Sequence, residues 1–465
     1  MSKSVAVVYD DTRRPGREIA VITGNKSFGD TIYKRRTLRE RVAEVFLGMP
    51  SVSGFYVKGS REIAGIKDTP VILYFSDFGI AKTEDLATIV YKAGYAHENY
   101  KITHRNRIAC VIFENEDEYF NASAGDYDKY TEIASDAFTD LSDVGNFRSF
   151  ITGGFDARYF NSLTGDEYTV VKSSEKTDKI KAEYSFYYLL PDDMKQWFVR
   201  PFDYREDDSG ASYRMQRYSM TDLAIRYVHG SVSLEEFDEV LKHLFHFLSN
   251  RKRVAVSEAD YEAMARRLYV TKVNDRVAQL KGSQGYGKIA SLIMALTPYP
   301  DIDAIVTRYV DMYDRARSQK RFEYVKCVSH GDMCFSNILY SNPDSLLIMV
   351  DPKGALSEEE LYMDPYYDVA KLSHSICGYY DFFNSDLYEI TVDANMMATV
   401  RVDADNRQFV GLFRDRLAAC GMDFELVRLY EASLFLSMLP LHMDRPQKVF
   451  GFIINALAIL DSLEK

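Results

Sequence analysis

The sequence has little cysteine, little tryptophan and no long apolar run. Its five cysteines stand at Cys110, Cys327, Cys334, Cys377 and Cys420. They are odd in number and include no close pair, so they fit neither a disulfide framework nor a zinc site. No apolar stretch approaches the roughly 18 residues that a membrane-spanning helix needs, and the first residues lack the apolar core of a secretory signal. We therefore expect a cytoplasmic protein without membrane insertion.

Positive charge is also scarce. The 465 residues include 57 Lys and Arg against 69 Asp and Glu, which gives a formal net charge of −12. This balance argues against a nucleic-acid partner, because proteins that coat nucleic acid or anionic lipid carry a basic surplus. The hydrophobic content of 46% is that of an ordinary globular chain. The length predicts two or three domains.

Residues 1–115 alternate short apolar runs with helical periods. Strands are predicted at 5–9, 71–75 and 108–113, and amphipathic helices at 37–46 and 84–92. This alternation predicts an α/β domain with a parallel sheet. Residues 116–145 are acidic and polar, and we expect them to form a connector with one short helix.

Beyond residue 145 the pattern changes. Hairpin strands and one helix are predicted for residues 146–218, and mostly helices for residues 219–465. This is an α+β bilobal arrangement, with a strand-rich small lobe and a helical large lobe. It has the outline of a kinase, although a fold outline alone does not fix a function.

One segment of the large lobe carries the strongest motif. It reads H-G-D-M-C-F-S-N at residues 330–337, followed by an apolar strand at 345–350 and by D-P-K-G at 351–354. Phosphoryl transfer to a hydroxyl needs a carboxylate free of metal, and an amide oxygen and a second carboxylate that hold Mg²⁺ against phosphate oxygens. Asp332, Asn337 and Asp351 supply these groups in that order. The strand between Asn337 and Asp351 would bring the two metal ligands together.

This segment resembles the catalytic segment of the aminoglycoside phosphotransferase and choline kinase family, the small-molecule branch of the protein-kinase-like fold. H-G-D-x-x-x-x-N, D-P-K-G and then D-P-Y-Y-D-V-A at 364–370 match in order. The resemblance implies ATP and Mg²⁺ as cofactors and Asp332 as the catalytic base. It implies Asn337 and Asp351 as metal ligands, and Asp368 as a structural brace of the catalytic loop.

The resemblance also requires three upstream features. A glycine-bearing turn between two strands is available at residues 151–160, where Gly153 and Gly154 would let the backbone approach phosphate. Lys172 ends an apolar strand and suits the α- and β-phosphates. Glu183, on a helix at 179–190, would pair with Lys172. The alternative is that Lys172 and Glu183 are solvated surface charges.

Residues 213–218 fit the last strand of the small lobe and the hinge after it, with adenine bound by backbone groups near Gln216 and Tyr218. Residues 269–276 are candidates to line the acceptor cleft, although an ordinary half-buried helix fits them as well. An aromatic group could form a cage for a cationic acceptor such as choline, or pack the core, which we favour. Its members are Tyr366, Tyr367, Tyr379, Tyr380, Phe382 and Phe383.

Residues 1–115 loosely resemble the nucleotide-binding core of sugar nucleotidyltransferases. Asp77 stands where that family has a metal-binding aspartate, but the family's glycine-rich, arginine-containing loop is not evident after Val8. A degenerate domain that binds a partner or a sugar nucleotide is therefore favoured over an active transferase. The resemblance implies a role in surface-polysaccharide or cell-envelope metabolism.

These patterns predict an ATP- and Mg²⁺-dependent phosphotransferase that phosphorylates a hydroxyl of a small molecule, such as a sugar or an amino alcohol. No long activation segment follows Asp351, so nothing indicates a protein substrate. Two alternatives stay open. One is a bifunctional nucleotidyltransferase–kinase, and the other is a non-catalytic nucleotide-binding pseudokinase module.

Overall fold

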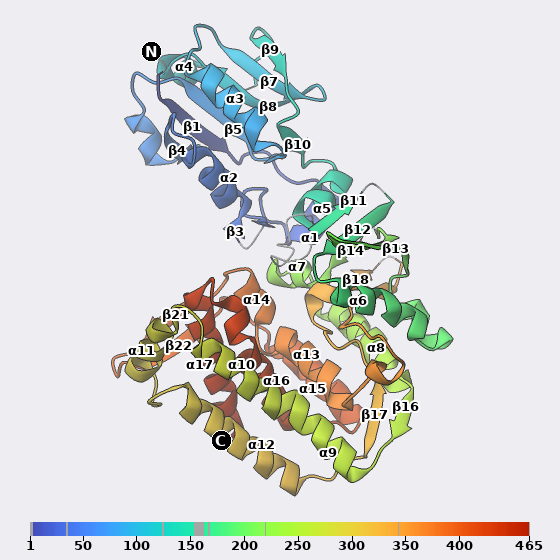
Figure 1. Ribbon diagram of the computed structural model, residues 1–465. Coiled ribbons are helices and arrows are strands. Elements are labelled where there is room, and N and C mark those ends of the chain that lie inside the picture. Colours follow the sequence, from blue (N-terminus) through green and yellow to red (C-terminus); the bar gives the residue numbers. More distant parts are fainter. Residues whose placement is uncertain are drawn as a thin grey trace. The chain divides into compact units, whose positions relative to one another are not determined.

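The computed structural model in Figure 1 describes residues 3–33, 36–122, 125–152, 162–165, 168–218, 220–342 and 344–464. Contacts divide the chain into two compact units. The first unit comprises Met1–Asp156 and Ile225–Ser231, and the second comprises Ala157–Ala224 and Val232–Lys465. None of the helices in the described ranges is long and apolar enough to cross a membrane.

The first unit is built on a six-stranded sheet with the order β4-β1-β5-β8-β7-β9. Its strands are β1 (Val5–Asp10), β4 (Val52–Val57), β5 (Val71–Phe75), β7 (Tyr100–His104), β8 (Arg107–Phe113) and β9 (Thr131–Ala134). Five helices accompany them: α1 (Arg17–Thr23), α2 (Leu38–Leu47), α3 (Thr83–Ala93), α4 (Glu116–Asn121) and α5 (Val144–Thr152). β1 and β5 are buried along their whole lengths, as expected of continuous apolar runs covered on both faces.

The prediction of a parallel sheet is wrong, because this sheet is mixed. β1 pairs in parallel with β4 and β5, but β8 runs antiparallel to both β5 and β7. The cause is local. Arg105 and Asn106 join β7 to β8 with φ angles of 48° and 65°, and two residues of positive φ are typical of a tight hairpin turn.

Residues 116–145, which were expected to form a connector with one short helix, contain strands in addition to that helix. Besides α4 they hold β9 and β10 (Phe138–Asp140). β9 adds in parallel to β7, and β10 pairs with β6 (Phe78–Ile80). These polar strands belong to the structured first unit because their backbone groups complete its ladders.

The second unit begins with a four-stranded antiparallel sheet of order β11-β12-β14-β13. Its elements are β11 (Ser162–Gly165), β12 (Thr169–Ser174), α6 (Thr177–Leu189), β13 (Pro201–Asp207) and β14 (Gly210–Gln216). α6 ends just before Pro191, which cannot continue a helix.

A strand was expected before the glycine-bearing turn at residues 151–160, but the described residues directly before Gly153 are helical. Ile151 and Thr152 close helix α5, because Phe147 and Ile151, four residues apart, are both buried on one face of that helix. Gly153 and Gly154 lie outside the described residues, so their proposed contact with phosphate stays a prediction.

The rest of the second unit is mainly helical. Its described helices are α8 (Leu234–Asn250), α9 (Glu258–Arg266), α10 (Lys272–Lys281), α11 (Tyr286–Leu296), α12 (Ile302–Gln319), α13 (Pro365–Ile376), α14 (Tyr380–Asn384), α15 (Arg407–Ala419), α16 (Phe424–Met438) and α17 (Pro446–Leu463). The residues of α7 (Leu223–Val228) are divided between the two units, with Ile225–Val228 in the first. α16 is buried along most of its length, because it is apolar around nearly its whole circumference. A π-helical segment, Arg267–Thr271, joins α9 to α10.

Two small sheets frame the catalytic segment. One has the order β15-β18-β19, with β15 (Thr221–Asp222), β18 (Ile338–Ser341) and β19 (Leu346–Met349). The other has the order β16-β17-β20, with β16 (Arg253–Ala255), β17 (Val325–Val328) and β20 (Tyr362–Met363). The Val199 N–H donates to the Met349 carbonyl at 3.1 Å, so the chain entering β13 is tied to β19.

Candidate functional site

Lys172, on β12, is held between two carboxylates. Its Nζ lies 2.7 Å from Glu183 Oε2 on α6 and 2.8 Å from Asp351 Oδ1, and its side chain is 3% exposed. Burial alone would lower the pKa of Lys172, but the charges of Asp351 and Glu183 outweigh it and raise that pKa. Lys172 and Glu183 are therefore buried and ion-paired, and the alternative of solvated surface charges is wrong.

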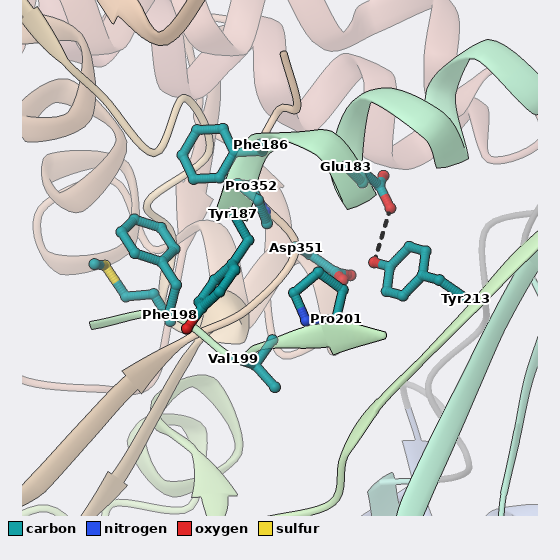
Figure 2. Close-up of a pocket in the computed structure, with 10 residues that line it drawn as sticks. Glu183, Phe186, Tyr187, Phe198, Val199, Pro201, Tyr213, Asp351 and Pro352 are labelled. Carbon is teal, nitrogen blue, oxygen red and sulfur yellow. Dashed lines mark hydrogen bonds between the residues drawn. The ribbon is translucent and has the colours of Figure 1, made fainter. Parts of the chain in front are cut away.

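Glu183 has a second partner that the sequence did not reveal. The Tyr213 hydroxyl donates to Glu183 Oε2 at 3.2 Å. Figure 2 shows both side chains beside a pocket that Asp351 also lines. The apolar members of that lining are Phe186, Tyr187, Phe198, Val199, Pro201, Met349 and Pro352. A largely apolar lining strengthens charge interactions at its edge, because less water screens them.

The loop that carries Asp351 is fixed against helix α6. Asp351 has a φ of 55°, a conformation that side-chain-bearing residues rarely adopt. Gly354 has a φ of 90°, and a Cβ there would come within 2.8 Å of the backbone of Ala182 and Glu183. The Ala355 N–H donates to the Ala182 carbonyl at 3.0 Å. Only glycine permits this approach, so Asp351 and Glu183 are positioned by one contact between loop and helix.

Asp332 and Asn337 lie together in the catalytic segment. Asn337 Nδ2 donates to the Asp332 carbonyl at 2.8 Å and to Asp332 Oδ2 at 3.3 Å. The Val350 N–H donates to the Asn337 carbonyl at 3.0 Å, which draws the start of the Asp351 loop to Asn337. The sequence predicted that the strand between Asn337 and Asp351 would bring those two residues together. This backbone hydrogen bond places Val350, the residue before Asp351, next to Asn337.

A lysine that the motif reading missed holds the Asp332 carboxylate. Lys371 Nζ, on α13, lies 2.8 Å from Asp332 Oδ1, and the two side chains are 13% and 34% exposed. Desolvation alone would lower the pKa of Lys371, but the Asp332 carboxylate raises it. Lys371 follows Asp368 by three residues on the same helix. Because residues at that spacing share a helix face, the spacing could have indicated that Lys371 lies near the catalytic loop.

Asp368 braces the backbone of the catalytic loop. It accepts hydrogen bonds from the N–H groups of His330, at 3.0 Å, and Gly331, at 2.8 Å. Its charge is balanced by Arg251 at 3.1 Å, and both side chains are buried. Arg251 comes from the end of α8 and could not be identified from the motif.

His330 fixes the loop through its ring. The Asp332 N–H donates to His330 Nδ1 at 3.1 Å, and His330 Nε2 lies 2.9 Å from the Val350 carbonyl. The ring can satisfy both contacts when it is neutral with its proton on Nε2. Burial lowers the pKa of His330, which favours that neutral form.

The predicted hinge residues lie between two sheets. Gln216 ends β14, Tyr218 follows it, and β15 begins at Thr221. Tyr218 packs against an apolar cluster that also receives Val170 from β12. Leu339, on β18, and Val350, directly after β19, pack against the same cluster. The sequence did not identify this cluster, because its members come from four separate segments.

The aromatic group after the catalytic segment is largely core. Four members are buried: Tyr367, Tyr380, Phe382 and Phe383. Tyr269, from the candidate acceptor stretch, is also fully buried and stacks on Tyr430 with ring centroids 3.8 Å apart. An open cage of these rings around a cation is not formed.

In the first unit, Asp77 is enclosed by arginines. Arg13 Nη1 lies 2.9 Å from Asp77 Oδ1, and Arg107 Nη2 lies 2.5 Å from Asp77 Oδ2. Nearby in sequence to Arg13, Asp10 ends β1 and accepts from Lys58 Nζ at 2.7 Å. Among the residues described here, no group of three or more His, Cys, Asp or Glu side chains could hold a metal ion.

Comparison with known proteins gives structural matches only. No family model matches the chain, and no curated protein matches it. A thermostable mutant of the aminoglycoside phosphotransferase APH(4)-Ia, in a ternary complex with ADP and hygromycin B, matches with 13% identity and a TM-score of 0.41, over 68% of this chain and 98% of that chain.

Two further matches are of the same kind. Aminoglycoside phosphotransferase APH(3'')-Id from Streptomyces rimosus, in complex with ADP and streptomycin, matches with 15% identity and a TM-score of 0.33, over 64% of this chain and 98% of that chain. APH(2'')-IIa with streptomycin and ATP matches with 13% identity and a TM-score of 0.38, over 66% of this chain and 90% of that chain. At these TM-scores the comparison decides no activity. These three solved structures, each of which matches about two thirds of this chain, are aminoglycoside phosphotransferases, the family that its catalytic segment resembles.

Proposed function

We propose that this chain is an ATP- and magnesium-dependent kinase that phosphorylates a hydroxyl group of a small molecule. The observation that carries the proposal is the contact of buried Lys172 with both Glu183 and Asp351. Lys172 and Glu183 lie on a consecutive strand and helix, and Asp351 lies on a loop 179 residues after Lys172. A fixed cation beside a partly exposed carboxylate is the arrangement that phosphoryl transfer requires.

Asn337 and Asp351 fit a magnesium ion. Asn337 commits its amide nitrogen to Asp332, which leaves its amide oxygen for another contact. Asp351 gives Oδ1 to Lys172 and is 40% exposed, and among the described residues no donor reaches its Oδ2. Magnesium in kinases takes one or two protein oxygens and completes its shell with phosphates and water. When bound, it would neutralise charge on the β- and γ-phosphate oxygens.

The nucleotide would lie between the four-stranded sheet β11-β12-β14-β13 and the β18–β19 hairpin. Val170 and Lys172 are two residues apart on β12, so their side chains share a face of that strand. The apolar cluster around Val170, Leu339 and Val350 suits a flat aromatic base. Lys172 would contact the phosphates next to it. Backbone groups near Gln216 and Tyr218 would bond the base edge.

Asp332 would act on the acceptor. Its carboxylate, oriented by Lys371 and Asn337, would take the proton of the acceptor hydroxyl. The acceptor oxygen would form a bond to the γ-phosphorus while the bond from that phosphorus to the ADP oxygen breaks. ADP leaves with the electron pair of the broken bond, and the product carries the phosphoryl group.

The remaining alternatives are less well supported. A pseudokinase module would have no need of an Asp332 held by two positioned partners. A bifunctional nucleotidyltransferase would need Asp77 to bind metal, and two arginines already occupy both of its carboxylate oxygens. We infer that Asp77 is a structural counter-ion.

The test is ATP turnover with Mg²⁺ over a panel of hydroxyl compounds that includes neutral sugars, sugar phosphates, hydroxy acids, amino alcohols and aminoglycosides. Turnover that depends on an acceptor and is lost in Asp332→Ala, while ATP binding is kept, is the expected result. Asp415→Ala is the matched control, because Asp415 is exposed on α15. Failure to bind ATP would overturn the proposal.

A further inference from the structure

Four basic side chains lie near the catalytic loop that carries Asp332. They are Arg267 in the π-helical segment, Lys272 at the start of α10, Lys353 after Asp351, and Lys371 on α13. We call them the basic cluster. Because they come from three separate stretches of the chain, the cluster is a product of the fold that no single stretch of sequence displays.

Tyr367 links two members of the basic cluster. Lys272 Nζ donates to the Tyr367 hydroxyl at 2.8 Å. Burial would raise the pKa of Tyr367, but the charges of Lys272 and Lys371 outweigh it and lower that pKa. The Tyr367 hydroxyl therefore lies in the positive field of both lysines, and Lys371 is itself in contact with Asp332.

Lys353 extends the cluster along the catalytic loop. Its N–H donates to the His330 carbonyl at 2.9 Å, and its side chain lies over Gly331, where a Cβ would meet Lys353 Cβ at 2.6 Å. Arg267 lies one π-helical turn before Lys272, because the Lys272 N–H bonds to the Arg267 carbonyl.

The cluster lacks a matching set of carboxylates. Asp332 pairs with Lys371, and Glu360 gives one oxygen to the Leu356 N–H. Among the described residues, no carboxylate forms an ion pair with Arg267, Lys272 or Lys353. This surplus occurs in a chain whose formal net charge is −12. Closely spaced like charges destabilise a fold, so a local surplus of them indicates a site for an anion.

Two observations assign that anion to the acceptor. The ATP phosphates already have Lys172, which pairs with Glu183 and Asp351, whereas the basic cluster reaches Asp332, the proposed base, through Lys371. In addition, Arg267 and Lys272 flank the π-helical segment, where the Lys272 N–H bonds to the Arg267 carbonyl. Such segments are rare and are found frequently at functional sites.

We infer that the acceptor is an anionic hydroxyl compound, carrying a phosphate or a carboxylate that Arg267, Lys272 and Lys353 bind while its hydroxyl faces Asp332. The inference rests on the proposed kinase function and names its substrate class. A polycationic acceptor would be repelled by the same side chains. The geometry therefore separates this chain from enzymes whose acceptors carry amines.

Calorimetric titration tests the anion site without turnover. Inorganic phosphate and, in a second arm, acetate are titrated into protein saturated with AMP-PNP and Mg²⁺, so that the nucleotide site is blocked. Phosphate or acetate is expected to bind, and Lys272→Ala and Arg267→Ala are each expected to weaken binding about tenfold, because each removes a charge-assisted contact. Lys281→Ala is the matched control, since Lys281 ends the same helix and pairs with Asp303 at 2.6 Å.

The two arms identify the anion, and the variants decide the inference. Preference for phosphate indicates a phosphorylated acceptor, and preference for acetate indicates a hydroxy acid. Absence of binding in both arms, or binding that Lys272→Ala and Arg267→Ala leave unchanged, overturns the inference. Failure of the kinase proposal is separate, because it would appear as no binding of AMP-PNP in the same cell before any anion is added.

Turnover with matched acceptors gives a second readout. Glucose is compared with glucose 6-phosphate, and glycerol with glycerol 3-phosphate, glycerate and choline. The anionic member of a pair is expected to have the higher kcat/KM, and Lys272→Ala is expected to raise the acceptor KM about tenfold with little change in kcat, as loss of uniform binding does. A higher kcat/KM for the neutral or cationic member, or a rise in the KM of ATP alone, contradicts the inference.

Discussion

Two clusters of acidic and basic side chains in this molecule differ in how far their carboxylates are buried and paired. In the first unit, Asp10 and Asp77 are buried, with side chains 3% and 2% exposed, and cations take both oxygens of Asp77. In the second unit, Asp351 is 40% exposed and gives one oxygen to Lys172. A buried, fully paired carboxylate has no position left for a ligand. A partly exposed one keeps such a position, so the second cluster is the one suited to chemistry.

Replacing one aspartate from each cluster should give the largest contrast. Asp351→Asn removes a metal ligand and a partner of Lys172, and is expected to lower kcat/KM for acceptor phosphorylation about 1,000-fold. Asp77→Asn is expected to leave kcat/KM within about twofold, because Asp77 contacts no reacting group. Steady-state ADP release with the best acceptor measures both. Comparable losses in the two variants would break the comparison.

Lys172 and Glu183 should differ from each other in the second cluster. Lys172→Met is expected to lower kcat/KM for ATP about 100-fold, because it removes the cation that faces the phosphates. Glu183→Gln is expected to cost only about tenfold, because Asp351 still holds Lys172. Lys195→Met is the control, since that lysine pairs with an exposed aspartate, Asp192. If Glu183→Gln were as damaging as Lys172→Met, Glu183 would do more than position the lysine.

The sequence predicted what is local and missed what the fold assembles. The order Asp332, Asn337 and Asp351 followed from spacing within one segment, and the pairing of Lys172 with Glu183 was implied by the family resemblance. Tyr213 and Lys371 were missed, since they reach these residues only after the sheet and helix α13 are in place.

The errors in the fold also have physical causes. The parallel sheet was wrong because a two-residue turn of positive φ, Arg105–Asn106, reverses the chain between β7 and β8. Periodicity alone cannot reveal that reversal. The strand expected before the turn at residues 151–160 was wrong, because burial of Phe147 and Ile151 on one face favours a helix there.

Stability should separate the clusters in the opposite sense to activity. Asp77→Asn removes the carboxylate that pairs with Arg13 and leaves Arg107 with Asp140 as its remaining acidic partner. It is expected to lower the free energy of unfolding by about 2 kcal/mol. Asp351→Asn is expected to change it by less than about 1 kcal/mol, because Glu183 still neutralises Lys172 and Asn tolerates positive φ well. Denaturant unfolding followed by circular dichroism measures both. A larger loss in Asp351→Asn would contradict the structural role given to Asp77.

The smallest effect expected is on the acid limb of the stability curve. Burial acts to raise the pKa of Asp10, but hydrogen bonds from Lys58 and Thr12 outweigh it and lower that pKa below its ordinary value. A carboxylate with a depressed pKa in the folded state stabilises the fold above the unfolded-state pKa of about 3.9, and this contribution is lost as the pH falls through the folded-state pKa. Asp10→Asn keeps the shape of the side chain and has no charge to titrate. Its free energy of unfolding should therefore fall less steeply than that of the parent protein between about pH 5 and pH 2. The parent and the variant are compared by urea unfolding at each pH. Parallel curves would show that the pairing of Asp10 with Lys58 contributes nothing to stability. The structural role of the first cluster would then rest on Asp77 alone.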